Sequence, residues 1–355
     1  LILDVNKLAR LRHIFKFPAS SLFVVPDELA FCRKGRGELP LSVCRPPHVI
    51  VSAARTFAVF SEDFIVVPPR QIGIVSETKD LDYLKALSLF LTSDFAFYHQ
   101  FLSATQFGVQ RGLATLRALR SIPVPISTNR DDLVPWVELH SKLVKPTPVG
   151  PRRSRKSSRN GQRELFDNDE VDLGPLLKEL NKLVNDALGL DERDRALIHD
   201  LVQVKLALND GKVGERAVRL PLIGEMKKYA KRLKSDLDAF IEDTSEKRHQ
   251  IGIVFDEVSA SGMIQIDLLA DKAAAREALV EPAGNATAKQ MEKTRKRLRK
   301  QHSQWVYFDR NLRIYEGTKT FIFKPLQRFH WTESQAMFDA TEIIAETLQI
   351  GDDSK

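Results

Sequence analysis

The side chains best suited to chemistry in this chain are those that bind nucleic acid. Lysine and arginine neutralise phosphates, and in a DNA groove arginine reads guanine while glutamine reads adenine. Such side chains gather at Arg70-Gln71, between two expected strands, and in the polar, glycine-containing segment 103–112, and two further arginines follow on one helical face. Each of them alone is more typical of an ordinary surface. The compact set predicts a DNA-binding face of Arg70, Gln71, Gln106, Gln110, Arg111, Arg117 and Arg120.

Motifs for catalysis are not recognisable. The chain has no GxGxxG, GxxxxGK[ST], HExxH or GxSxG pattern. Asp27 and Glu28, with Lys34, resemble part of the acidic centre of metal-dependent nucleases, but the second acid and lysine of an alternating strand are missing. The histidines are scattered, and Cys32 and Cys44 form no CxxC pair, so we expect no metal site. A nuclease remains the weakest of three alternatives.

Composition limits the class of protein. A chain of 355 residues predicts about two domains, and 43% hydrophobic and 28% charged residues are typical of a globular protein. No apolar run approaches the roughly 18 residues of a membrane helix, and two cysteines fit a reducing cytoplasm. The net charge of +7 favours a polyanionic partner, although solubility alone also explains it. The chain begins at Leu1, so we expect it to be part of a longer protein.

Residues 1–145 are expected to combine a small sheet with helices. Apolar runs of strand length, separated by proline or acidic residues, occur at 49–51, 57–60, 64–67 and 72–75. They predict an antiparallel or mixed sheet. Apolar residues recur every three or four positions from Leu81 to Tyr98, behind the helix-favouring Asp80 and Asp82, and a further helix is expected at 131–145.

A basic linker is expected to follow, at 146–163. The segment 145–163 holds seven Lys/Arg, no acid, and several prolines, glycines and serines, so it cannot bury enough apolar surface to fold. Its Arg152, Arg153 and Arg155 could add phosphate contacts of no sequence preference, although a solvated tether explains them equally well. Two apolar-striped helices, expected to meet at Gly189–Asp191, make up the region 164–211.

Residues 212–355 predict a separate α+β domain. An amphipathic pattern covers 223–241, and apolar runs at 251–255 and 263–268 flank Ser259-Ala260-Ser261-Gly262, which indicates a hairpin. A charged helix is expected at about 286–300. Further strands are expected at 305–308, 312–315 and 321–323, and Thr332 opens a last helix with capping-box spacing.

Several blocks together resemble the target recognition domains of restriction-modification proteins. Tyr83–Ser93 is similar to that module's leucine-rich helix, and 107–125, with Arg111-Gly112 and Ile122-Pro123-Val124-Pro125, is similar to its ending. Pro47–Ser52, 58–60 and 72–74 resemble its strands, and Leu183–Glu192 resembles its later helix pair. The blocks occur in the order of the module and cover about 45–210.

The resemblance implies that the region grips duplex DNA for an adenine N6-methyltransferase of the type I or type IIG kind. The methylase domain of such enzymes flips the adenine and carries an (N/D)PP(Y/F) motif and an S-adenosylmethionine loop. Neither is present here, because Val67-Pro68-Pro69-Arg70 lacks the polar residue and the aromatic. We therefore expect no cofactor in this chain and a methylase domain upstream or in another subunit. Residues 305–310 and 329–332 more loosely resemble tails of large adenine methylases.

The interpretation is thus an α+β chain: a mixed small-sheet recognition domain with long helices, then a second α+β domain with antiparallel hairpins. The expected divisions are 1–145, 146–163, 164–211 and 212–355. Expected partners are duplex DNA and a methylase domain or other complex subunits, with no membrane. The alternative is an interaction scaffold of a multi-subunit defence complex. Residues 1–144 carry +4, 145–163 carry +7 and the remainder −4, which directs DNA to 1–163 and protein contacts to 212–355.

Overall fold

The computed structural model has an α+β fold and divides into two compact units, Leu1–Asp191 and Glu192–Lys355. The structure describes residues 1–8, 14–24, 41–52, 57–68, 71–104, 116–145, 173–209, 215–243, 245–270, 276–284, 289 and 312–352. The unit boundary falls inside the expected helix pair 164–211, so the two helices of that pair belong to different units. The expected linker 146–163 lies outside the described residues.

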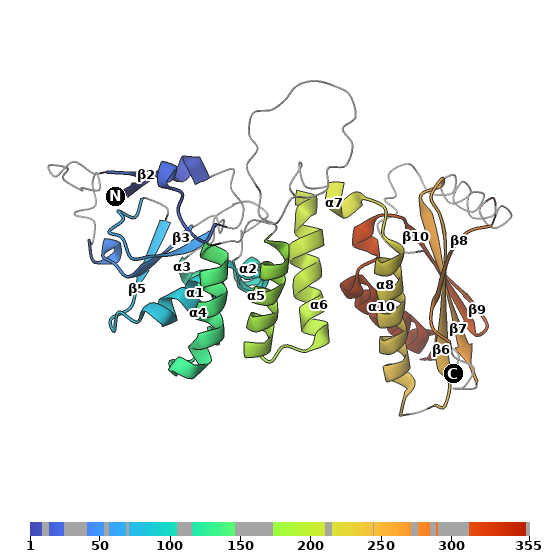
Figure 1. Ribbon diagram of the computed structural model, residues 1–355. Coiled ribbons are helices and arrows are strands. Elements are labelled where there is room, and N and C mark those ends of the chain that lie inside the picture. Colours follow the sequence, from blue (N-terminus) through green and yellow to red (C-terminus); the bar gives the residue numbers. More distant parts are fainter. Residues whose placement is uncertain are drawn as a thin grey trace, which may run out of the picture. The chain divides into compact units, whose positions relative to one another are not determined.

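The first unit is built on a three-stranded antiparallel sheet with β3 in the centre (Figure 1). Its strands are β3 (His48–Ser52), β4 (Ala58–Ser61) and β5 (Gln71–Val75). Every residue of β3 is buried, because β3 has packed side chains on both faces. The predicted strands at 49–51, 57–60 and 72–75 are therefore confirmed.

The predicted strand at 64–67 is wrong. Val66 forms only an isolated parallel bridge with Ile2, and its amide donates to the carbonyl of Leu1. Ile2 begins the short strand β1 (Ile2–Leu3), which pairs antiparallel with β2 (Leu22–Phe23). The 64–67 run is apolar because Ile65 and Val67 pack in the core formed with the N-terminal segment, and burial does not require a strand ladder.

Helices cover the other face of this sheet. They are α1 (Leu81–Thr92), α2 (Asp94–Ser103), α3 (Leu116–Arg120), α4 (Arg130–Val144) and α5 (Gly174–Ala187). The single helix predicted from Leu81 to Tyr98 is two, because Ser93 adopts an extended backbone and its hydroxyl caps α2 by accepting from the Ala96 amide. Leu84, Phe90 and Trp136 are among the buried side chains of this helical core.

The second unit packs helices on one face of a five-stranded sheet of order β8-β6-β7-β10-β9 (Figure 1). Its strands are β6 (Arg248–Asp256), β7 (Ser261–Leu269), β8 (Leu279–Pro282), β9 (Leu312–Glu316) and β10 (Lys319–Pro325). All neighbours are antiparallel except β6 and β8. The predicted hairpin is β6–β7, and the strands at 312–315 and 321–323 are also present. The expected strand at 305–308 lies outside the described residues, as does most of the helix at 286–300.

The helices of this unit are α6 (Glu192–Asp200), α7 (Glu215–Val218), α8 (Ile223–Ile241) and α10 (Glu333–Asp352). The apolar core lies between α8, α10 and the sheet, with Leu233, Ile253, Ile264, Ile322 and Trp331 all fully buried. In the described part of the chain, no helix is long and apolar enough to span a bilayer.

Candidate nucleic-acid interface

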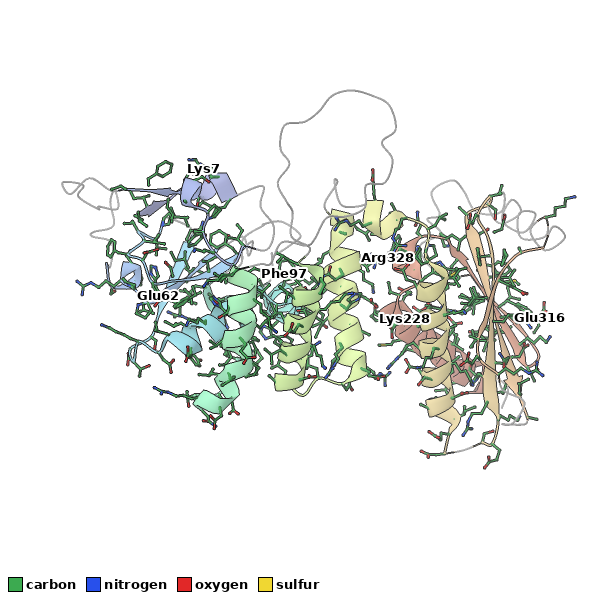
Figure 2. The ribbon with its side chains drawn as sticks, viewed as in Figure 1. Lys7, Glu62, Phe97, Lys228, Glu316 and Arg328 are labelled. Carbon is green, nitrogen blue, oxygen red and sulfur yellow. The ribbon has the colours of Figure 1, made fainter. Side chains whose placement is uncertain are left out.

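Arg117 and Arg120 are the candidate DNA ligands that the structure places most clearly. Both lie exposed on α3, three residues apart and hence on one side of the helix. Between them, Ala118 is buried in a cluster with Phe97 and Phe101 of α2 (Phe97 is labelled in Figure 2). Leu119 is buried in the helical core. The apolar pair anchors α3, so the two guanidinium groups are directed outward.

These arginines carry charge that the described residues do not neutralise. No ion pair or hydrogen bond from the described parts of the chain reaches the guanidinium group of Arg117 or Arg120, whereas many other cations of the chain have a carboxylate partner. Two exposed arginines without ion-pair partners, held on an anchored helix, are suited to phosphate contacts, because their charge is available to a polyanion.

Gln71 is placed differently. It begins β5, pairs with Ser52 of β3, and its amide donates to the carbonyl of Pro68. Its side chain is half-buried, and its Oε1 has no hydrogen-bond partner among the described residues. No hydrogen bond joins Gln71 to either arginine of α3. Because that oxygen is buried, Gln71 does not present it to a base in this structure, and the structure does not unite Gln71 with Arg117 and Arg120 in one site.

The remaining candidates lie outside the described residues. They are Arg70, Gln106, Gln110, Arg111, Arg152, Arg153 and Arg155, together with Asp27, Glu28 and Lys34 of the nuclease alternative. Within the described ranges, no group of three or more His, Cys, Asp or Glu side chains is arranged to hold a metal ion.

The first unit also contains a pocket of about 780 Å³ that no sequence pattern indicated. We call it the aromatic pocket. It lies between the N-terminal segment, the end of β4, α1 and α4, and its walls include Phe15, Phe17 and Phe60 with Lys85 and His140. These residues come from four separate stretches of sequence, so only the folded chain brings them together.

A second hollow, of about 450 Å³, lies between α6 and α8 in the second unit. Arg195 and His199 border it from α6, and Lys228 and Lys231 from α8 (Figure 2 labels Lys228). Asp200 is buried beside His199; its carboxylate accepts from the Ser334 amide at 2.7 Å and lies 3.1 Å from His199 Nδ1. Glu192 and Glu333 also border the hollow, so its charge is mixed rather than strongly basic.

In comparisons with known proteins, no protein-family model, no curated protein and no solved structure matches this chain. The resemblance to target recognition domains therefore stays an interpretation of its residues.

Proposed function

We propose that this chain recognises duplex DNA as part of an adenine N6-methyltransferase of a restriction-modification or phage-defence system. The first unit binds the duplex and selects the recognition sequence, while S-adenosylmethionine is bound by a catalytic domain outside these residues. Such a role belongs in the cytoplasm, where the chromosome is. The observation that supports it best is the exposed, unpaired arginine pair on α3, in a unit that also contains the basic segment 145–163.

Salt dependence tests the proposal most directly. We expect the full chain to bind a pool of random duplexes at low salt, with log K falling linearly as log salt rises. The double variant Arg117→Ala/Arg120→Ala should lower the slope by about one for each phosphate that is no longer neutralised. Fluorescence anisotropy at several salt concentrations measures both quantities.

Arg130→Ala is the matched control. Arg130 is another exposed arginine of the same unit, at the start of α4, and it is not part of the proposed interface. Its loss should leave the slope almost unchanged. Absence of binding to any duplex at low salt contradicts the proposal. Arg70→Ala and Arg111→Ala test base contacts, because a variant that no longer touches a base has weaker site preference as well as weaker affinity.

A second function, as an interaction scaffold, is favoured by one feature of the second unit. Val218, Leu220, Leu222 and Ile223 are large apolar residues close together in sequence, and all are exposed, Leu222 by 62%. Exposed apolar side chains gathered in this way are typical of protein contact surfaces. If a partner subunit binds here, Leu222→Ser/Ile223→Ser should abolish co-purification with that subunit and leave duplex binding intact.

A further inference from the structure

The aromatic pocket of the first unit contains a buried polar atom that lacks a partner. His140 borders the pocket from α4, is only 7% exposed, and its Nε2 has no hydrogen-bond partner among the described residues. Leaving a buried polar group unpaired costs free energy, so such an atom indicates a place where a ligand can bind.

The imidazole of His140 is neutral over the ordinary pH range. Burial lowers the pKa of His140 to about 4, and the nearby charge of Lys85 acts in the same direction. A neutral imidazole nitrogen either donates or accepts, depending on its tautomer. Lys85 supplies a group that can only donate: its amine lies 5.7 Å from the centre of the Phe60 ring and 3.5 Å from the Asp82 carboxylate, and an ammonium has three donors to share.

The walls of the pocket suit a flat ring. Phe15 and Phe17 are buried, and the ring of Phe60 meets that of His140 edge to face, with their centres 5.7 Å apart. Glu62 and Asp63 line the same pocket and are exposed (Figure 2 labels Glu62). A ligand is therefore offered aromatic surface, a donor at Lys85, a donor or acceptor at His140, and carboxylate acceptors at the rim.

We propose that this pocket binds a single unpaired nucleobase, with guanine preferred. Guanine carries acceptors at O6 and N7 and donors at N1 and N2, on different edges of one planar ring. O6 and N7 match Lys85 and the Nε2–H tautomer of His140, while the N–H groups match Glu62 or Asp63. Apolar walls with a few convergent polar groups, in a volume of this size, are typical of small-molecule sites.

Other ligand classes fit this pocket less well. An isolated phosphate gains little here, because the two carboxylates oppose the two lysines, Lys16 and Lys85, that line the pocket. A purely apolar ligand would leave His140 Nε2 without a partner, which is the costly arrangement that the pocket already has. The proposal does not rest on duplex recognition, because it requires only a free base.

The test uses guanosine, which carries no phosphate, and the full-length chain. Saturation-transfer NMR should show guanosine protons contacting the protein, and the ¹⁵N signal of His140 Nε2 should shift on guanosine addition. His140→Phe should remove that signal and weaken binding roughly tenfold or more, because the hydrogen bond to the ligand is removed while an aromatic ring is kept. Lys85→Met provides a second variant should His140→Phe unfold.

Each variant has a matched control that leaves the pocket intact. His99→Phe replaces another histidine of the unit, and Lys142→Met replaces an exposed lysine of α4 whose amine pairs with Glu179 at 3.0 Å. Both should bind guanosine as the wild type does. The proposal is overturned if guanosine does not bind at millimolar concentration, if it binds more weakly than adenosine, or if His140→Phe and Lys85→Met bind guanosine normally.

The source of the base is decided by competition. If a duplex with one bulged guanine displaces guanosine, whereas the fully paired duplex does not, the pocket takes a base extruded from DNA. If neither duplex competes, it takes a free nucleoside or nucleotide. Guanosine binding by Arg117→Ala/Arg120→Ala should be unchanged, so failure of the DNA proposal and failure of this one are distinguishable.

Discussion

The surroundings of His140 couple its protonation to the stability of the first unit. In the unfolded chain a histidine has a pKa of about 6.5, whereas burial lowers the pKa of His140 in the folded chain to about 4. Between these values the unfolded chain binds a proton that the folded chain does not. Stability is therefore lost as pH falls from about 6.5 to about 4.

We expect His140 to account for up to about 3 kcal/mol of this acid destabilisation, from a pKa difference of about 2.5 at about 1.4 kcal/mol each. His140→Phe keeps the ring and removes the titration. The free energy of unfolding of the variant, measured in urea from pH 7 to pH 4, should therefore fall less steeply than that of the wild type. Parallel curves would contradict this assignment.

A buried ion pair lies in the core of the second unit. Lys324 and Asp339 are fully buried and in contact, and Tyr229 donates to Asp339 at 2.6 Å. The Lys324 amine also donates to the Tyr229 hydroxyl at 2.9 Å and to the His330 carbonyl at 3.2 Å. Burial and the Asp339 charge raise the pKa of Tyr229, so its hydroxyl stays protonated and remains a donor.

Lys324→Met should destabilise the chain by about 3–5 kcal/mol, because it leaves the carboxylate of Asp339 buried without its cation. Lys319→Met is the control. It lies on the same strand, but its amine is half exposed and lies 3.7 Å from Asp267, so its loss should change stability by less than about 1 kcal/mol. Chemical denaturation measures both. Equal effects of the two substitutions would show that the buried pair contributes nothing beyond an exposed one.

The sequence made some of these residues predictable and hid others. Arg117 and Arg120 could be predicted, because helical spacing alone puts them on one face and a polar arginine is expected outside. His140, Lys85 and Phe60 could not, since their proximity depends on how α1, α4 and β4 pack. Lys324 and Asp339 lie 15 positions apart on a strand and a helix, and no local pattern shows that both are buried.

At the scale of elements, the close contact of β7 with the segment before α10 depends on a glycine. A Cβ added to Gly262 would lie 2.5 Å from the Trp331 ring, which is fully buried. Gly252, on the neighbouring strand β6, is the opposite case, because a Cβ there would meet no described atom within 4 Å. Gly262 therefore serves packing, whereas Gly252 does not.

Gly262→Ala should cost about 1–3 kcal/mol through overpacking against Trp331. Gly252→Ala, in the same sheet, should be neutral or slightly stabilising, because alanine loses less backbone entropy on folding. The midpoints of urea unfolding compare the two directly. A destabilisation of Gly252→Ala as large as that of Gly262→Ala would show that backbone strain, rather than the tryptophan contact, sets the cost.

The β6–β7 hairpin was predictable from the sequence, because the alternation of apolar residues in its two strands reflects their pairing in one sheet. β6 and β7 alternate buried and half-buried residues, and their hairpin was therefore recognisable. Residues 64–67 were not, because their apolar character reflects burial against the N-terminal segment. The break at Ser93 was also hidden, since apolar spacing continues from α1 into α2 while a single serine ends one helix and caps the next.

At the scale of the whole molecule, the two structural units divide the net charge differently from the regions expected from the sequence. Residues 1–191 carry 26 basic and 21 acidic side chains, a net of +5, and residues 192–355 carry 28 and 26, a net of +2. The acidic character expected for the rear of the chain belongs to residues 164–191, which the structure places in the first unit. The second unit is therefore not acidic, and its α6–α8 hollow contains Lys228 and Lys231.

This division gives a prediction for the separated units. Because each unit has its own apolar core, fragments 1–191 and 192–355 should each unfold cooperatively in urea when produced alone. Duplex binding should stay with 1–191, with nearly the salt slope of the full chain, because the unpaired arginines of α3 and the basic segment 145–163 are both in it. Lys228→Met/Lys231→Met in the full chain is the complementary variant and should leave duplex affinity unchanged. Binding that follows 192–355, and is abolished in that lysine variant, would move the DNA contact to the α6–α8 hollow and leave the first unit with the nucleobase pocket alone.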